Sequence, residues 1–119
     1  MDWTDYMNAT KDQVRVLNRT IPETTKAFGA LGKAVKETGA LDVKTKEFVA
    51  LGIAVADRCE SCIGFHVEAL AKAGATREEV ADVLSMCVQM GGGPSLMYAA
   101  KALDAWDQLC GSSEARAAE

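Results

Sequence analysis

Two cysteines and the only histidine of the chain lie close together, in Cys59-Glu-Ser-Cys62-Ile-Gly-Phe-His66. A helix turns by about 100° per residue, so residues spaced i, i+3 and i+7 lie on one face of it. If a helix begins near Cys59, two thiols and an imidazole share that face. The pattern therefore predicts thiol chemistry with a base beside it.

The spacing of the two thiols suits redox chemistry. Two residues between cysteines bring the sulfurs close enough to form a disulfide, so one thiol can attack a substrate and the other can resolve the product. A free thiol has a pKa of about 8.5, and the partial positive charge at a helix N-terminus favours the reactive thiolate. This argument makes Cys59, the earlier cysteine, the more acidic. His66 lies one turn beyond Cys62 and can accept or relay its proton.

A carboxylate precedes the cysteines at the head of an apolar segment. Residues 48–56 are apolar without interruption, which predicts a helix that is buried on most sides. Glu47 is a candidate to orient the His66 imidazole or to exchange protons with it, if the fold brings Glu47 back to the site. The alternative is a surface carboxylate in the first turn of a helix, where the dipole favours it. Arg58 either lowers the pKa of the thiol beside it or pairs with Glu60 or a neighbouring subunit.

Four residues together carry a family resemblance: Glu47, Cys59, Cys62 and His66 form the pattern E-x11-C-x2-C-x3-H. This pattern resembles the core of the alkylhydroperoxidase D (AhpD-like) family, within the carboxymuconolactone decarboxylase superfamily. The resemblance extends from about Pro22 to about Leu109. It includes the apolar segment before the cysteines, the connection Lys72-Ala-Gly-Ala-Thr-Arg-Glu-Glu79 and the turn Met90-Gly-Gly-Gly-Pro94.

The resemblance implies a role for each of the four residues. Cys62 would attack the peroxide, Cys59 would resolve the intermediate, and Glu47 and His66 would form the proton relay. The resemblance thus assigns attack to Cys62, whereas the helix-dipole argument favours Cys59 as the more acidic thiol. Ser61 stands where some relatives have a second histidine between the cysteines.

The implied activity is that of a thiol-dependent peroxidase or disulfide oxidoreductase that reduces hydroperoxides through a Cys59/Cys62 dithiol–disulfide cycle. It needs no cofactor beyond this redox-active disulfide, but an external dithiol donor of the lipoyl or thioredoxin type must regenerate the thiols. The resemblance also implies that subunits of this kind assemble into ring-like trimers or hexamers. The apolar segment 48–56 also favours self-association, so we expect a homo-oligomer.

Three other functions compete with the peroxidase. A carboxymuconolactone decarboxylase-type enzyme acting on a small acidic lactone does not need the cysteine pair, so the intact C-x-x-C argues against it. A redox sensor or accessory protein would use the same disulfide as a switch without turnover. A zinc site would require Glu47, Cys59, Cys62 and His66 as an uncommon ligand set, since no second C-x-x-C is present, and we expect no metal.

Composition excludes other classes of protein. A net charge of −4 without a basic cluster argues against nucleic-acid binding. No segment approaches the roughly 20 apolar residues of a membrane span, and no signal peptide is visible. We therefore expect a cytoplasmic protein. The 119 residues fit one domain over 1–110, followed by a small polar tail at 111–119 that should fray.

Local patterns predict an all-α domain of five to six helices, with the C-x-x-C at the N-terminus of a central helix. The expected helices span residues 3–18, 22–38, 43–57, 60–73, 77–90 and 94–109. Capping boxes are expected at Thr20/Glu23 and at Thr76/Glu79, and Asp42 is the expected N-cap of the third helix.

The two remaining cysteines have no place in this chemistry. Cys87 falls in the apolar stripe of the fifth expected helix and should be a core residue. Cys110 follows the last helix and should be an incidental exposed thiol. The stripe expected to bury the last helix consists of Leu96, Ala99, Ala100, Leu103 and Trp106.

Overall fold

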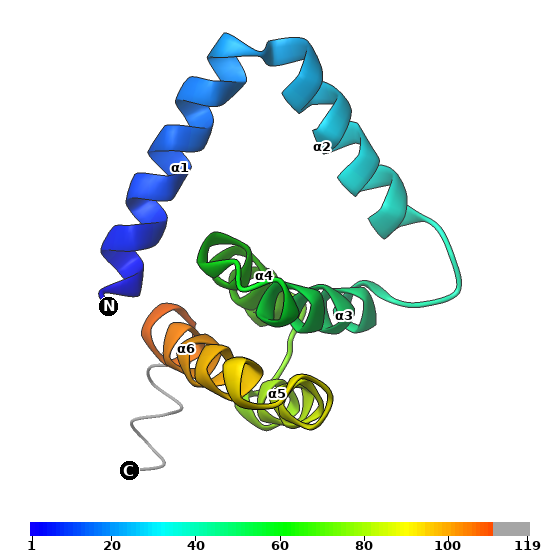
Figure 1. Cartoon of the computed structure of the whole chain (residues 1–119). Coiled ribbons are helices and arrows are strands. Elements are labelled where there is room, and N and C mark those ends of the chain that lie inside the picture. The colour runs from blue at the N-terminus through cyan, green and yellow to red at the C-terminus, as the bar shows by residue number, and fades with distance from the viewer. Residues whose placement is uncertain (111–119) are drawn as a thin grey trace.

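The computed structural model describes residues 1–110, which form helices and no strand. The all-α prediction is confirmed, with helices α1 (Trp3–Thr20), α2 (Pro22–Glu37), α3 (Val43–Ala56), α4 (Glu60–Lys72), α5 (Arg77–Gly91) and α6 (Gly93–Leu109). Helices α3 to α6 pack together, while α1 and α2 form a V-shaped arm whose apex points away from them (Figure 1). No helix within this part of the chain is long and apolar enough to cross a bilayer. The tail predicted to fray, 111–119, lies outside the described residues.

The sequence predicted two of the three N-caps correctly. The Asp42 carboxylate accepts a hydrogen bond of 2.8 Å from the Thr45 backbone N–H and so begins α3. Thr76 and Glu79 form the expected reciprocal capping box at α5. These bonds satisfy backbone donors that have no partner within the helix.

The capping box predicted at Thr20 is wrong. Thr20 belongs to the last turn of α1, where its hydroxyl donates to the Val16 carbonyl oxygen at 2.7 Å. Ile21 separates the two helices without a side-chain cap. Pro22 can begin α2 here because the first helical position needs no N–H donor.

The core is formed by one side of each of α3 to α6, closed by the N-terminal half of α1. Helix α4 lies at its centre, because it packs against α1, α3 and α6. The C-x-x-C is therefore at the start of a central helix, as predicted. The core residues are Trp3, Met7, Leu51, Ala54, Val55, Ile63, Val67, Leu70, Val80, Leu84, Ala99, Ala102, Ala105 and Trp106.

Two burial predictions were wrong in part. In α3, Leu51 and Val55 are buried, but Val49 and Ile53 are exposed, because no other element of the described chain covers that side. In α6 the buried face is rotated from the predicted stripe. It consists of Ser95, Ala99, Ala102, Ala105 and Trp106, while Leu96 and Ala100 are exposed.

Gly64 lets α1 approach α4 closely. A Cβ atom at this buried position would overlap the side chain of Met7, which is itself buried. We expect Gly64→Ala to lower the free energy of unfolding by about 1–3 kcal/mol, since the added methyl group overpacks the contact. Chemical denaturation measures the change. Gly29→Ala in α2 is the control, because a Cβ there meets nothing within 4 Å and alanine favours a helix. Equal stability of Gly64→Ala and the wild type would contradict the close contact.

Candidate functional site

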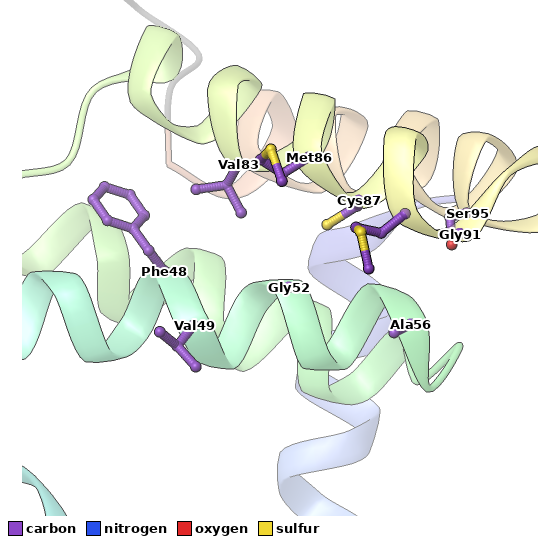
Figure 2. A pocket seen from close by; sticks show the side chains of 10 residues that line it. Phe48, Val49, Gly52, Ala56, Val83, Met86, Cys87, Gly91 and Ser95 are labelled. Carbon is purple, nitrogen blue, oxygen red and sulfur yellow. The ribbon is translucent and has the colours of Figure 1, made fainter.

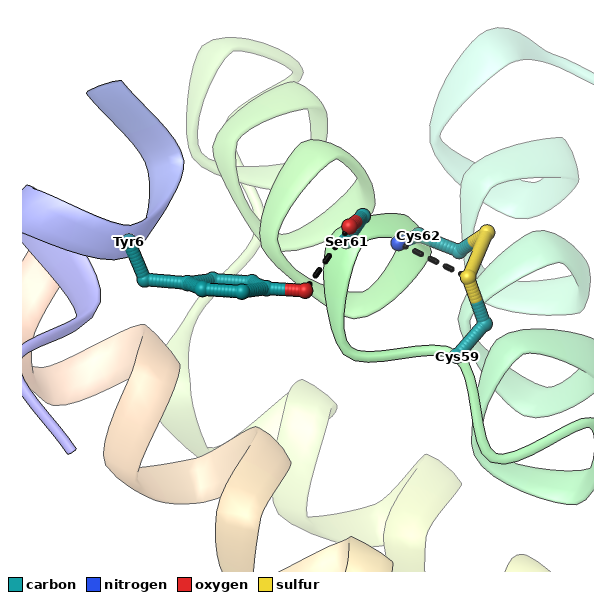
Figure 3. The surroundings of a disulfide bond; sticks show 4 residues. All are labelled: Tyr6, Cys59, Ser61 and Cys62. Carbon is teal, nitrogen blue, oxygen red and sulfur yellow. Dashed lines mark hydrogen bonds between the residues drawn. A yellow bond between two sulfur atoms is a disulfide. The ribbon is translucent and has the colours of Figure 1, made fainter. Parts of the chain in front are cut away.

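Cys59 and Cys62 form a disulfide at the start of α4, with their Cα atoms 5.2 Å apart. Cys59 is the N-cap, and its Sγ accepts the backbone N–H of Cys62 at 3.2 Å (Figure 3). Both side chains are partly exposed. Cys59 therefore caps the helix, whereas Cys62 and His66 lie on it one turn apart. The pair is placed where the N-terminal end of α4 favours negative charge on sulfur.

A tight turn joins α3 to the disulfide. The backbone N–H of Cys59 bonds back to the Ala54 carbonyl oxygen at 3.1 Å, and that of Arg58 to the Val55 carbonyl oxygen at 3.2 Å. Arg58 has a left-handed backbone, with φ of 56°, which is uncommon for a residue with a side chain. Strained residues of this kind often lie at functional sites. The turn fixes Cys59 against the C-terminal end of α3.

The side chain of Arg58 lies near a second pair of residues. Tyr98 from α6 hydrogen-bonds Glu60, and this bond is the main reason why the pKa of Tyr98 is raised. The Arg58 charge acts in the opposite direction on the same hydroxyl. Glu60 thus has Tyr98 as a partner, and Arg58 adds positive charge beside the turn that carries Cys59.

The fold returns Glu47 to the site. Its side chain is only 2% exposed, so the surface alternative is wrong. One carboxylate oxygen, Oε2, lies 2.6 Å from Nδ1 of His66 on α4. The other, Oε1, lies 3.0 Å from Nζ of Lys36 at the end of α2. Both oxygens of a buried carboxylate are therefore paired, one of them with the imidazole.

These contacts decide the charge of Glu47. Burial raises the pKa of its carboxyl, but hydrogen bonds from Lys36 and His66 lower it, and the net pKa lies below the ordinary value of 4.5. Glu47 is consequently ionised at neutral pH. A carboxylate at Nδ1 favours a proton on that nitrogen and leaves Nε2 of His66 as the available base.

A small pocket brings the imidazole and the disulfide to one space. It has a volume of about 190 Å³ and lies between α3 and α4, lined by Ala50, Ile53, Ala54, Asp57, Cys59, Cys62 and His66. Pockets for drug-sized ligands measure about 300–1,000 Å³, so this one suits a small oxidant or the end of a longer molecule. The His66 side chain remains 31% exposed, which leaves it accessible from this pocket.

Two neighbours of the site were missed from the sequence. Lys36 lies eleven residues before Glu47 on another helix. Its only local signal is that a lysine suits the last turn of a helix. Tyr6 of α1 places its hydroxyl 2.9 Å from Oγ of Ser61, the residue between the two cysteines (Figure 3). No local pattern connects Tyr6 with a residue so far along the chain.

The other two cysteines lie away from the disulfide, and both are partly buried. Cys87 is partly buried and packs against the core, as predicted, but its side chain also lines an apolar groove between α3 and α5 (Figure 2). Burial raises the pKa of its thiol. The prediction for Cys110 is wrong: it is not an exposed thiol, since it packs against the core and donates a hydrogen bond of 3.4 Å to the Val67 carbonyl oxygen. Burial raises the pKa of Cys110 to about 11. Neither thiol belongs to the site.

The polar and sulfur atoms of the site are paired with one another. Within residues 1–110, no group of three or more His, Cys, Asp or Glu side chains is arranged to hold a metal ion. The Glu47 oxygens are bonded to Lys36 and His66, and the two sulfurs are bonded to each other. The chemistry of this arrangement is that of a disulfide beside a paired imidazole.

Comparison with known sequences agrees with the family resemblance of the four-residue motif. A sequence model of the carboxymuconolactone decarboxylase family matches residues 22–105, which include all four predicted site residues. An uncharacterized protein of Cupriavidus necator is 39% identical over 97 residues, covering 82% of this chain and 86% of the relative. Uncharacterized protein 4 in the cox locus of Paracoccus denitrificans is 36% identical, covering 72% of this chain and 78% of the relative.

Two solved structures have a similar fold. The first is a carboxymuconolactone decarboxylase family protein from Legionella pneumophila, with a TM-score of 0.85 and 45% identity over 89% of this chain and 95% of the other. The second is a family protein from Thermotoga maritima, with a TM-score of 0.74 and 30% identity over 91% of this chain and 94% of the other. Involvement in an antioxidative response has been suggested for the Thermotoga protein.

Proposed function

The chain belongs to the carboxymuconolactone decarboxylase family, and from this membership and the site we propose that it is a thiol-dependent peroxidase of the alkylhydroperoxidase type. It reduces hydroperoxides by cycling Cys59 and Cys62 between dithiol and disulfide. The observation that carries the proposal is the 2.6 Å contact between Glu47 and His66, with His66 opening onto the same pocket as the disulfide. A purely structural disulfide has no need of a buried, ionised carboxylate behind an imidazole.

The reaction has two steps on the protein. His66 takes the proton of Cys62, and the thiolate attacks the terminal peroxide oxygen. The O–O bond breaks, an alcohol leaves with a proton, and Cys62 becomes a sulfenic acid. The Cys59 thiol then attacks the Cys62 sulfur, so that the S–O bond breaks, water leaves and the disulfide forms. Two thiols are oxidised while one hydroperoxide is reduced to alcohol and water.

An external dithiol closes the cycle. Its thiolate attacks the Cys59–Cys62 disulfide, and its second thiol releases both cysteines in the reduced form. We propose a donor of the lipoyl or thioredoxin type. Donors of this kind act where thiols are kept reduced, which fits a cytoplasmic site of action. The half-exposed sulfurs at the start of α4 are accessible to such a donor.

Two alternatives use the same fold in other ways. A decarboxylase acting on a small acidic lactone would need groups that bind an anion in the pocket. The pocket instead contains Asp57, the disulfide and apolar side chains around His66. A redox sensor would need only the disulfide, without the Glu47–His66 pair. The pair therefore favours turnover over sensing.

Steady-state kinetics test the proposed function. We expect the wild-type protein to consume hydrogen peroxide and an organic hydroperoxide continuously when dihydrolipoamide or reduced thioredoxin is supplied, and to be inactive on a muconolactone. One equivalent of peroxide consumed per chain, followed by no further reaction with either donor, would favour the sensor. Lactone turnover without peroxide consumption would favour the decarboxylase and reject the proposal.

A further inference from the structure

The last turn of α2 joins the arm to the body formed by α3 to α6. The Nζ atom of Lys36 lies 3.0 Å from Oε1 of the buried Glu47. Lys46, the preceding residue of α3, donates from its own Nζ to the carbonyl oxygen of Val35, at 2.6 Å, and to that of Thr38. Two neighbouring residues of α3 thus hold the end of α2, where the arm returns to the body (Figure 1).

A docking role alone does not account for the contact between Lys36 and Glu47. The lysine side chain is about half exposed, and an ion pair with a solvated lysine contributes little to stability because water screens it. Burial of a carboxylate also costs free energy that an apolar side chain would avoid. Lys46 already fixes the end of α2 through hydrogen bonds to the backbone. The contact is therefore better explained by its effect on the relay.

One carboxylate serves two basic groups in this relay. Oε1 of Glu47 faces the Lys36 ammonium, and Oε2 lies 2.6 Å from Nδ1 of His66. Within residues 1–110 these are the two groups whose charge acts on Glu47, and no charge on α5 or α6 does so. Lys44, on the same helix, is paired instead with Glu79 of α5 at 3.0 Å. The negative charge of Glu47 is therefore shared between Lys36 and His66.

This sharing limits how strongly the imidazole holds a proton. A carboxylate beside an imidazole stabilises the imidazolium and so favours a second proton on the ring. The Lys36 ammonium balances the charge of Glu47 and acts against that second proton. Because Nδ1 is occupied by its bond to Glu47, the second proton binds at Nε2, where the proton of Cys62 arrives. Lys36 thus weakens the hold of His66 on the proton that it takes from the thiol.

We propose that Lys36 is a positioning residue that acts on His66 through Glu47: it balances the carboxylate charge and so lets His66 give back the proton taken from Cys62. The proposal rests on the thiol chemistry proposed above. In the attack step, the Cys62 thiolate forms an S–O bond with the terminal peroxide oxygen, the O–O bond breaks and an alkoxide departs. The alkoxide takes the proton from Nε2 and leaves as alcohol. An acid–base catalyst works best when it both takes and releases a proton near the working pH.

The ring of His66 gives a direct test, because it is the only histidine of the chain. Its NMR signals can be followed in the disulfide form, where neither site thiol takes part. We expect the pH midpoint of these signals to rise by about 0.3–1 pH unit in Lys36→Met, since one screened positive charge is removed, and to fall in Glu47→Gln. Lys36→Arg keeps the charge and should restore the midpoint. Lys33→Met is the matched control, because it removes the same charge from an exposed pair with Glu37.

Alkylation of Cys62 in the reduced protein tests the effect on the thiol. A base that holds its proton more strongly draws the proton from Cys62 more readily, so the alkylation curve of Lys36→Met should shift to lower pH. His66→Ala and Glu47→Gln weaken the base and should shift the curve to higher pH. Peroxide turnover of Lys36→Met should still fall by about 2–3-fold near neutral pH, because the imidazolium protonates the alkoxide less readily. Turnover equal to or above that of the wild type would overturn the proposal.

A docking role predicts a different pattern for the same variants. If Lys36 only fastens α2, Lys36→Met should lower the free energy of unfolding and leave both pH curves in place. If Lys36 only orients Glu47, both curves should move in the direction of Glu47→Gln. Either result overturns the proposal. Failure of the peroxidase itself is distinguishable, because the ring titration and the alkylation need no peroxide. Both shifts in a protein without turnover would reject the peroxidase and still support the action of Lys36 on His66.

Discussion

Cys62→Ser should abolish peroxide consumption, whereas Cys59→Ser should stop the reaction after a single turnover. A serine hydroxyl cannot replace a thiolate as the nucleophile, so we expect the rate with Cys62→Ser to fall by about 10³-fold or more. Cys59→Ser keeps the attacking thiol but lacks the resolving one, so the Cys62 sulfenic acid should accumulate. Mass spectrometry after dimedone labelling should find the adduct on Cys62 in Cys59→Ser and none in Cys62→Ser.

The same pair of variants decides which thiol attacks. The structure places Cys59 at the N-cap, where its sulfur already accepts the backbone N–H of Cys62, and this favours a thiolate on Cys59. Cys62 lies one helical turn from His66, which favours proton removal from Cys62. Family resemblance also assigns attack to Cys62. If the dimedone adduct forms on Cys59 in Cys62→Ser, the two roles are reversed. Cys87→Ser is the control and should leave turnover unchanged, because Cys87 lies outside the site.

The elements around the site could be predicted because their signals are local. Asp42 begins α3 and Thr76 begins α5, and each side chain bonds to a backbone N–H only three residues away. The position of the C-x-x-C at the start of α4 follows from the same kind of short-range pattern. Thr20 shows the limit of such patterns, because a threonine at a helix end can bond equally to the preceding turn.

The contacts between elements could not be predicted in the same way. Glu47 was a candidate from its position in the motif, but its burial depends on α2 and α4 meeting it from two sides. Lys36 and Tyr6 lie on the arm, and nothing in their neighbourhood marks them as neighbours of the site. The exposure of Val49 and Ile53 was missed for a related reason. An uninterrupted apolar run predicts that a helix is buried, but it does not reveal which sides of the helix other elements of the chain cover.

His66→Ala should slow the formation of the Cys62 thiolate at neutral pH while leaving the protein folded. His66 is partly exposed, so its truncation removes little core packing. A positioned general base contributes about 10²–10⁴-fold to a rate, and we expect a loss near the lower end for peroxide reduction. The direct measurement is the pH dependence of Cys62 alkylation by iodoacetamide in the reduced protein, followed by peptide mass spectrometry. The His66→Ala curve should shift to higher pH, because the thiol then ionises without a base beside it.

Glu47→Gln separates the charge of the relay from its geometry. A glutamine oxygen can still accept from Nδ1 of His66, but it cannot stabilise positive charge on the imidazole. We therefore expect an intermediate loss of about 10-fold, as for other residues that orient a reacting group.

The pH dependence of Glu47 itself has a definite sign. Lys36 and His66 outweigh burial and hold the pKa of Glu47 below 4.5 in the folded protein. The carboxylate therefore contributes stability above that pH, and this contribution is lost as the pH falls through the lowered value. Glu47→Gln should lose less stability than the wild type in this range, because its side chain cannot be protonated, and chemical denaturation at several pH values measures the difference. Superimposable alkylation curves for the wild type, His66→Ala and Glu47→Gln would show that neither residue acts on the thiol, and the disulfide would then work without the relay.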